Sequence, residues 1–216
     1  DGIRASVASR GRGDVYKRQA QFKDPIAATI VDGNLYVADA TNDKIRKIVI
    51  STGVVTNFAG SGSGGSTDAT GTAAKFDFPS GITTDGTNLY VVDHFNHTIR
   101  KIVISTGAVT TLAGTAGSSG STDATGTSAR FNNPQGITSD GTNLYVADKS
   151  NHLIRKIVIS TGVVSTLAGS TTSGSTDATG TSAKFSNPVG IVTDGTNLYV
   201  GDFNNHKIRK LSLIHI

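Results

Sequence analysis

Three polar residue types recur four times along the chain at one fixed spacing, which makes them the first candidates for chemistry. In each set an asparagine follows the aspartate by three residues and an arginine follows it by seven. The residues are Asp39, Asp93, Asp148 and Asp202, then Asn42, Asn96, Asn151 and Asn205, then Arg46, Arg100, Arg155 and Arg209. An active site needs one asymmetric constellation, so a fourfold recurrence argues against catalysis.

A structural role accounts better for this recurring set, although a ligand role remains open. We expect the aspartates and asparagines to close turns by hydrogen bonds between side chain and backbone. We expect each arginine to bridge to a carboxylate or to loop carbonyls, with its aliphatic stem covering apolar surface.

Histidine and cysteine offer no alternative centre. The four residues Asp43, His97, His152 and His206 occupy one equivalent position in successive units, so they cannot converge on a single metal. The chain has no cysteine, which excludes disulfides, thiolate catalysis and cysteine-ligated zinc. We therefore predict no catalytic residue, no metal site and no cofactor.

Three loops rich in Gly, Ser and Thr share the core Ser-Thr-Asp-Ala-Thr-Gly-Thr, and calcium binding is conceivable there. Their ranges are 61–75, 115–130 and 170–184, with one aspartate each at Asp68, Asp123 and Asp177. One carboxylate per loop is too few for the six or more oxygens that calcium takes. We interpret each loop as an ordered turn that ends in an Ala and Phe anchor between neighbouring units, such as Ala74 and Phe76.

The elements that must position these residues repeat with the same period. Phe22, Phe76, Phe131 and Phe185 are separated by 54, 55 and 54 residues, and four tyrosines repeat in step. A regular period of this size is typical of a repeat architecture. The 26 glycines and the low charged fraction of 17% favour short strands joined by turns.

One unit divides into four short strands at 81–85, 88–93, 98–104 and 108–113, with Asp-Gly or Thr-Gly at the two tight turns. The third strand, 98–104, is apolar on both faces, as expected for a strand covered on both sides. Four antiparallel strands with both sheet faces buried against identical neighbours describe an all-β protein with the blades of a β-propeller, rather than a solenoid or a sandwich.

The repeated segments resemble the NHL repeat. They are, in one copy, Pro134-Gln135-Gly136-Ile137, the run 144–148, Asn151-His152-Leu153-Ile154-Arg155 and the run 164–169. The resemblance covers residues 20 to 210. It implies a parent of about six blades, so we expect an open arc or a strained four-bladed ring whose exposed edges favour association.

The resemblance also implies where enzyme relatives would hold their ligands. Amidating lyases and lactonases of related type place acids and histidines on the first strands around a central channel. Here the first strands at 27–29, 81–83, 136–138 and 190–192 carry only Gly, Ala, Ile, Val and Thr. We predict a non-enzymatic chain; the alternative is a fragment of such a lyase or lactonase whose active site lies in other blades.

We divide the chain into units 20–75, 76–130 and 131–184 and an incomplete unit 185–210. Residues 1–19 lack periodicity, and we interpret them as non-native or disordered; they and the tail 211–216 resemble translated sequencing-adapter read-through. The first nineteen residues hold five basic and two acidic side chains and so carry +3 of the formal +4 charge. The nearly neutral repeats make nucleic acid an improbable partner.

Differences between the units concentrate on one face, where the turn between strands two and three emerges beside the loop between units. We predict that this variable face binds a protein or a glycan; neutral drift is the competing interpretation. Its candidate residues are His94, Phe95, Lys149, Ser150, Phe203, Asn204, Phe78, Asn133 and Asn187.

A second alternative is RNA binding, which some NHL propellers perform through a strongly basic surface. The variable face offers Lys149 and His94 but no cluster of arginine or lysine. No run of 18 apolar residues occurs, so we expect no membrane insertion. We predict an extracellular or cell-surface bacterial protein.

Overall fold

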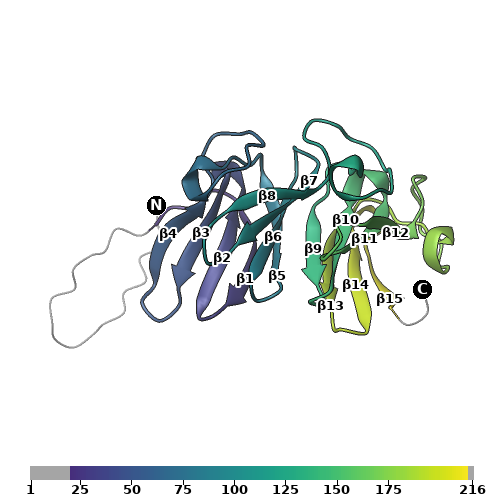
Figure 1. Cartoon of the computed structure of the whole chain (residues 1–216). Coiled ribbons are helices and arrows are strands. Elements are labelled where there is room, and N and C mark those ends of the chain that lie inside the picture. The colour runs from purple at the N-terminus through teal and green to yellow at the C-terminus, as the bar shows by residue number, and fades with distance from the viewer. Residues whose placement is uncertain (1–19, 214–216) are drawn as a thin grey trace, which may run out of the picture.

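A computed structural model describes residues 20–213, and within them the chain forms four antiparallel sheets in sequence order (Figure 1). Blade 1 contains β1 (Pro25–Val31), β2 (Asn34–Asp39), β3 (Lys44–Val49) and β4 (Val54–Ala59). Blade 2 contains β5 (Pro79–Thr84), β6 (Asn88–Asp93), β7 (Thr98–Val103) and β8 (Val109–Ala113). Blade 3 contains β9 (Gly136–Ser139), β10 (Asn143–Asp148), β11 (Leu153–Val158) and β12 (Val164–Gly169). Blade 4 contains β13 (Pro188–Thr193), β14 (Asn197–Asp202) and β15 (Lys207–Ser212).

Six single 3₁₀ turns complete the described residues, and none of the helices there has the length and apolarity to span a membrane. They are η1 (Ala40–Asn42), η2 (Gly71–Ala73), η3 (Gly126–Ser128), η4 (Lys149–Asn151), η5 (Gly180–Ser182) and η6 (Phe203–Asn205). The predicted N-terminal segment 1–19 and residues 214–216 of the predicted tail lie outside the described residues. Leu211 and Ser212, also assigned to that tail, lie in β15.

Each blade is an up-and-down meander in which every strand pairs with the next one in sequence. In blade 2, Tyr90 lies opposite Lys101 and Val91 opposite Arg100, a register that puts alternate residues on opposite sheet faces. The turn from β7 to β8 places Gly107 at a φ of 71°, a conformation that glycine adopts without steric cost. The first strand of this blade starts at Pro79, two residues before the predicted position.

The core lies between the blades rather than inside any one of them. Leu89 and Val91 of blade 2 pack with Tyr36 and Ile45 of blade 1, and the anchor residue Phe76 is fully buried in the same cluster. Equivalent clusters join blade 2 to blade 3 and blade 3 to blade 4. This arrangement is the predicted all-β propeller architecture, in which both faces of a blade are covered by its neighbours.

The two terminal blades each expose one face. One isoleucine position, occupied by Ile45, Ile99 and Ile154, has no solvent exposure in blades 1 to 3, whereas its equivalent Ile208 in blade 4 is 77% exposed. Ile30 on the outer face of blade 1 is also exposed. Within residues 20–213 no hydrophobic cluster joins blade 4 back to blade 1, so the described chain is an open propeller arc.

In blades 2 and 3 the first strand has room only for glycine at one position, whereas blade 1 carries Ala27 there. A Cβ atom on Gly81 of β5 would lie 2.6 Å from the carbonyl oxygen of Gln135 in the next blade. Gly190, the equivalent residue of β13, has nothing within 4 Å of the same point. The glycine therefore permits close approach of successive first strands near the propeller axis.

We predict that Gly81→Ala destabilises the chain by about 1–3 kcal/mol, because the added methyl group forces the first strands of blades 2 and 3 apart. The matched variant Gly190→Ala is expected to be neutral or slightly stabilising. Urea unfolding followed by circular dichroism gives both values. Equal effects of the two substitutions would contradict this account of blade packing.

Candidate functional site

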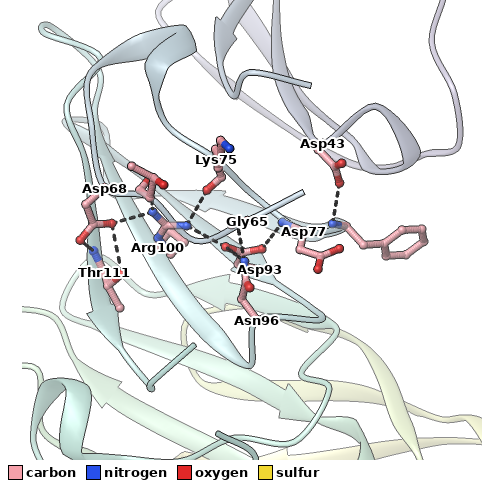
Figure 2. Close-up of polar contacts among 11 residues, drawn as sticks. Asp43, Gly65, Asp68, Lys75, Asp77, Asp93, Asn96, Arg100 and Thr111 are labelled. Atoms are coloured by element: carbon pink, nitrogen blue, oxygen red, sulfur yellow. Dashed lines mark hydrogen bonds and ion pairs between the residues drawn. The ribbon is translucent and has the colours of Figure 1, made fainter. Parts of the chain in front are cut away.

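The recurring arginine is the centre of a polar cluster that fastens the loop between blades to the next blade (Figure 2). In blade 2, Nη1 of Arg100 donates to Oδ2 of Asp93 at 2.7 Å and to the carbonyl oxygen of Lys75 at 2.9 Å. Its Nη2 forms an ion pair with Oδ1 of Asp68 at 2.6 Å. The guanidinium carbon also lies 5.2 Å from the ring centroid of Phe76. We call Arg100 and these polar partners, with their equivalents in other blades, the arginine cluster.

Asp93 and Asn96 complete the arginine cluster from the turn between β6 and β7. Asp93 Oδ1 accepts the backbone N–H of Asp77 at 2.7 Å, and Asn96 donates from Nδ2 to Asp93 Oδ2 and to the carbonyl oxygen of Gly65. Burial raises the pKa of Asp93 to about 6, against the opposing effects of the Asp77 N–H, Arg100 and Asn96. The carboxylate is therefore predominantly ionised at neutral pH, and its hydrogen-bonding capacity is used within the fold.

The loop aspartate tethers the outermost strand. Asp68 accepts both the backbone N–H of Thr111 at 3.0 Å and its hydroxyl at 3.1 Å, while also pairing with Arg100. Asp123 makes the same contacts with Thr166 and Arg155 in blade 3. These aspartates thus serve as structural acceptors, and no group of three or more acidic, histidine or cysteine side chains in residues 20–213 is arranged to hold a metal ion.

The same cluster recurs in the other blades with different exposure to water. Arg155 and Asp148 are fully buried in blade 3 at 2.8 Å, and burial raises the pKa of Asp148 as it does that of Asp93. The pairs Arg46–Asp39 in blade 1 and Arg209–Asp202 in blade 4 are 3.0 Å apart. Asn42, Asn151 and Asn205 donate to their own blade's aspartate. All the predicted structural residues therefore lie in one type of cluster.

The residue at the end of each turn links one blade to the next. His97, with a φ of 58°, accepts the backbone N–H of Asn133 at Nδ1 with a distance of 3.0 Å. His152 accepts from Asn187, and in blade 1 a carboxylate oxygen of Asp43 accepts from Phe78. The sequence shows that these residues occupy one equivalent position in each unit but does not reveal the contact, because it joins residues about 35 positions apart.

On the variable face, three predicted residues of blade 2 come together as an aromatic cluster. The ring centroids of Phe78 and Phe95 are 5.2 Å apart, those of His94 and Phe95 are 4.8 Å apart, and those of Phe78 and His94 are 5.8 Å apart. Phe95 is 52% exposed, while His94 is buried beneath it. We use the name aromatic cluster for these three side chains.

Phe78 occupies a backbone conformation that disfavours it. Its φ is 58°, and the equivalent residues Asp24, Asn133 and Asn187 have similar positive values. Aspartate and asparagine tolerate the left-handed region, whereas a phenylalanine there costs about 1–2 kcal/mol. Blade 2 therefore carries an aromatic side chain at a position where the other three blades carry a residue suited to the turn.

The surroundings of His94 favour the neutral form of its ring. Burial lowers its pKa, the hydrogen bond to the Pro134 carbonyl opposes this effect, and nearby Lys149 and His97 lower the pKa further. Because a carbonyl only accepts, Nδ1 of His94 carries the proton and donates across 2.7 Å to Pro134 of the next blade. The aromatic cluster is thereby fixed against blade 3.

The other predicted face residues extend this surface over blades 3 and 4. Asn133 donates from Nδ2 to the Ser150 hydroxyl at 3.3 Å, beside Lys149. In blade 4, Phe203 is 61% exposed and Asn204 is exposed next to it. The backbone of Asn187 is held by His152. The structure brings the residues of blades 2 and 3 into contact through His94 and Pro134, and places Phe203 and Asn204 on the following blade.

A hollow of about 400 Å³ lies where the four first strands converge. Its lining is mostly glycine and aliphatic, but it includes Ser80 and Gln135, and the Ser80 hydroxyl donates to the Gln135 carbonyl at 3.0 Å. The predicted first strand of blade 2 began at Gly81 and so left out Ser80, which β5 includes. Each of the two residues directly follows a proline, Pro79 or Pro134.

The tight turns on the opposite face have their own polar set. Asp85 accepts hydrogen bonds from the Tyr90 hydroxyl and from Asn88 and Thr87. Burial alone would raise the pKa of Asp85, but these donors outweigh it and lower the pKa to about 2. Asp140 and Asp194 repeat the arrangement, so this face is uniform between blades 2 and 4.

The fold and the repeated arginine cluster define a β-propeller assembled from homologous units. The family model for the NHL repeat matches residues 131–157. NHL repeat-containing protein 2 from Homo sapiens is 33% identical over 168 residues, covering 71% of this chain and 23% of that protein. The chain belongs to the NHL-repeat family and spans about a quarter of the length of this curated relative.

Solved structures support the same fold. A structural genomics protein of unknown function from Bacteroides thetaiotaomicron has a TM-score of 0.71 at 25% identity, covering 86% of this chain and 46% of that one. An auxiliary nutrient binding protein from the same species has a TM-score of 0.66 at 23% identity, covering 85% and 46%. Identity at this level establishes the architecture and leaves the activity of the present chain to its own surface.

We predict that Arg100→Met lowers the free energy of unfolding by about 3–5 kcal/mol, because it leaves the buried Asp93 carboxylate without its cation. Arg209→Met in blade 4 is the matched control. Asp202 is buried like Asp93, but the side chain of Arg209 is 10% exposed where that of Arg100 has no exposure, and its loop partner Asp177 is 85% exposed, so we expect a smaller loss. Urea unfolding measures both. An Arg100→Met loss no larger than that of the control would be inconsistent with the proposed role of burial.

We further predict that His97→Asn reduces the sensitivity of the fold to mild acid. Burial lowers the pKa of His97 below its ordinary value of 6.5, so the unfolded chain binds the proton more tightly and stability falls as the pH drops through that value. Asparagine can accept the Asn133 N–H without titrating. The melting temperature of the variant should therefore rise relative to wild type between pH 7.5 and 5; a constant difference would count against this titration.

Proposed function

We propose that the chain is a non-enzymatic binding module that captures a protein or a glycan through its variable face. The single observation that carries the proposal is Phe78, an aromatic residue with a φ of 58° that packs beside His94 and the exposed Phe95. Conformational cost concentrated at one surface position is a feature of binding sites, where the surrounding structure maintains it.

The surroundings of the aromatic cluster suit recognition of a partly apolar ligand. Phe95 presents an exposed ring, and Asp77 and Lys149 lie close enough to affect the charge state of His94. Burial raises the pKa of Asp77, with a further contribution from Asp43 and an opposing one from His94. An exposed aromatic ring next to a carboxylate can contact either a sugar ring or an aromatic-rich peptide.

The rigidity of the propeller supports this use of the face. The turns that carry His94 and Phe95 are fastened by the arginine cluster, so little conformational entropy would be lost on binding. The nutrient-binding neighbour is consistent with a binding class, but the proposal rests on the surface of this chain. We predict that the module acts outside a bacterial cell or at its surface.

We expect Phe95→Ser combined with Phe203→Ser to weaken ligand capture at least tenfold without changing the fold, because both rings are exposed. Ligands are first identified by screening a glycan array and a displayed peptide library with the wild-type chain, and their binding to the double variant is then measured. Val54→Ser is the matched control, since Val54 is exposed to a similar extent at the tight-turn end of blade 1. Ligands retained equally by the double variant would refute the surface assignment.

A further inference from the structure

The outer edge of β15 lies beside a groove of about 490 Å³ formed by blade 4 and the loop before it. Five consecutive residues of β15 line the groove on one side, and Asp177, Ala178, Ala183 and Phe185 line the other. Within residues 20–213 no strand pairs with this edge, whereas β7 and β11 each pair with a fourth strand. We call this feature the strand groove.

In blades 2 and 3 the position equivalent to the strand groove is occupied by the fourth strand, β8 or β12, which shows what residues fit there. In blade 3, β12 pairs with β11 so that Thr166 lies opposite Arg155 and Val164 opposite Ile157. Val164 is buried and donates its N–H to the carbonyl oxygen of Ala124 at 2.9 Å. Blade 2 repeats this with Val109 and Ala69. The corresponding acceptor in the strand groove is the carbonyl of Ala178.

Asp177 provides a second recognition point. In blade 3 the equivalent Asp123 binds both the N–H and the hydroxyl of Thr166, and its side chain is 46% exposed. Asp177 pairs with Arg209 at 2.6 Å but is 85% exposed, and within residues 20–213 no threonine donates a hydrogen bond to its carboxylate as in blades 2 and 3. A threonine opposite Arg209 would restore the pair of hydrogen bonds made in the other blades.

The far end of the groove requires small residues. In blade 3 the strand ends with Ala168 and Gly169, both buried. A Cβ atom on Gly169 would lie 2.5 Å from the carbonyl oxygen of His152, and its φ of 96° favours glycine. The carbonyl of His206 is the equivalent backbone group in blade 4, so a bulky residue is excluded at this position.

We propose that the strand groove binds an extended peptide of sequence Val-x-Thr-Leu-Ala-Gly, which adds to β15 as a fourth antiparallel strand. Backbone hydrogen bonds to β15 supply affinity, while Asp177, the Ala178 carbonyl and the narrow glycine position supply specificity. The occupant is a segment with the repeat's own fourth-strand sequence, since two copies of that sequence fill the same position in blades 2 and 3, while blade 1 carries Asn57 and Phe58 in place of the threonine and leucine. The groove lies on blade 4 and does not involve the aromatic cluster, so this proposal is independent of the proposed function.

The test uses the full chain and a fluorescein-labelled peptide copying residues 160–170, Ser-Thr-Gly-Val-Val-Ser-Thr-Leu-Ala-Gly-Ser. Fluorescence anisotropy should show saturable binding. A peptide with valine in place of the threonine that copies Thr166 should bind roughly three- to tenfold more weakly, because the hydroxyl bond to Asp177 is lost while the backbone N–H bond remains. A peptide with valine in place of the glycine that copies Gly169, and a scrambled peptide, should not bind measurably.

Protein variants locate the site. Asp177→Ala should weaken binding of the native peptide by at least a similar factor. The Asp177 side chain is 85% exposed, so we expect this variant to fold. Asp68→Ala is the matched control in blade 2, where β8 already fills the groove, and should leave peptide binding unchanged. The peptide variants need no refolding, so the sequence preference can be measured even if a protein variant is unstable.

Three outcomes would overturn the proposal. The first is the absence of saturable binding up to about 1 mM peptide, which would mean a binding free energy smaller in magnitude than about 4 kcal/mol. The second is equal binding of the native and scrambled peptides. The third is a chain that self-associates in sedimentation velocity and takes up no peptide, because a second copy would then be the occupant of the edge.

Discussion

The buried ion pair between arginine and aspartate is the constraint on which the rest of the propeller depends. Arg100 contacts groups from the loop before its blade, from the turn within its blade and, through Asp68, from the outermost strand. A guanidinium has five N–H donors in a fixed plane and remains charged, so it can hold several segments at once. Removing the arginine leaves the buried Asp93 carboxylate without a cation, which explains why the aspartate and the arginine recur together.

Because this cluster fixes the loops, the apolar packing between blades can be made from few residue types. Leucine, valine and isoleucine of one blade meet tyrosine, alanine and isoleucine of the blade before it, and the same positions serve at all three interfaces. Stability therefore depends on nearest neighbours, as in other repeat proteins. The uncovered faces at Ile30 and Ile208 are the surfaces that such an interface buries when a neighbour is present.

Most of the fold could be predicted from the sequence because the signal is periodic. The spacing of Phe and Tyr gave the unit length, and Asp-Gly and Thr-Gly marked the tight turns within it. The contacts that join units could not be predicted in the same way. The bond from Asn133 to His97 and the partnership of Asp68 with Thr111 connect residues 36 and 43 positions apart, and neither leaves a local pattern. The aromatic cluster was predicted as separate exposed residues, and its packing depends on the positive φ of Phe78, which the sequence does not reveal.

The single irregularity in the period, 55 residues instead of 54, falls in the loop that follows blade 2. Thr115 and Ser118 form a small bridge there with Gly117 at a φ of 73°, upstream of the Gly120 carbonyl that Asn151 binds. The extra residue therefore lies in a turn that precedes Gly120, the residue that Asn151 holds in place. Evolution, or a protein engineer, can lengthen that turn and graft new sequence into it while the register of every downstream strand is preserved.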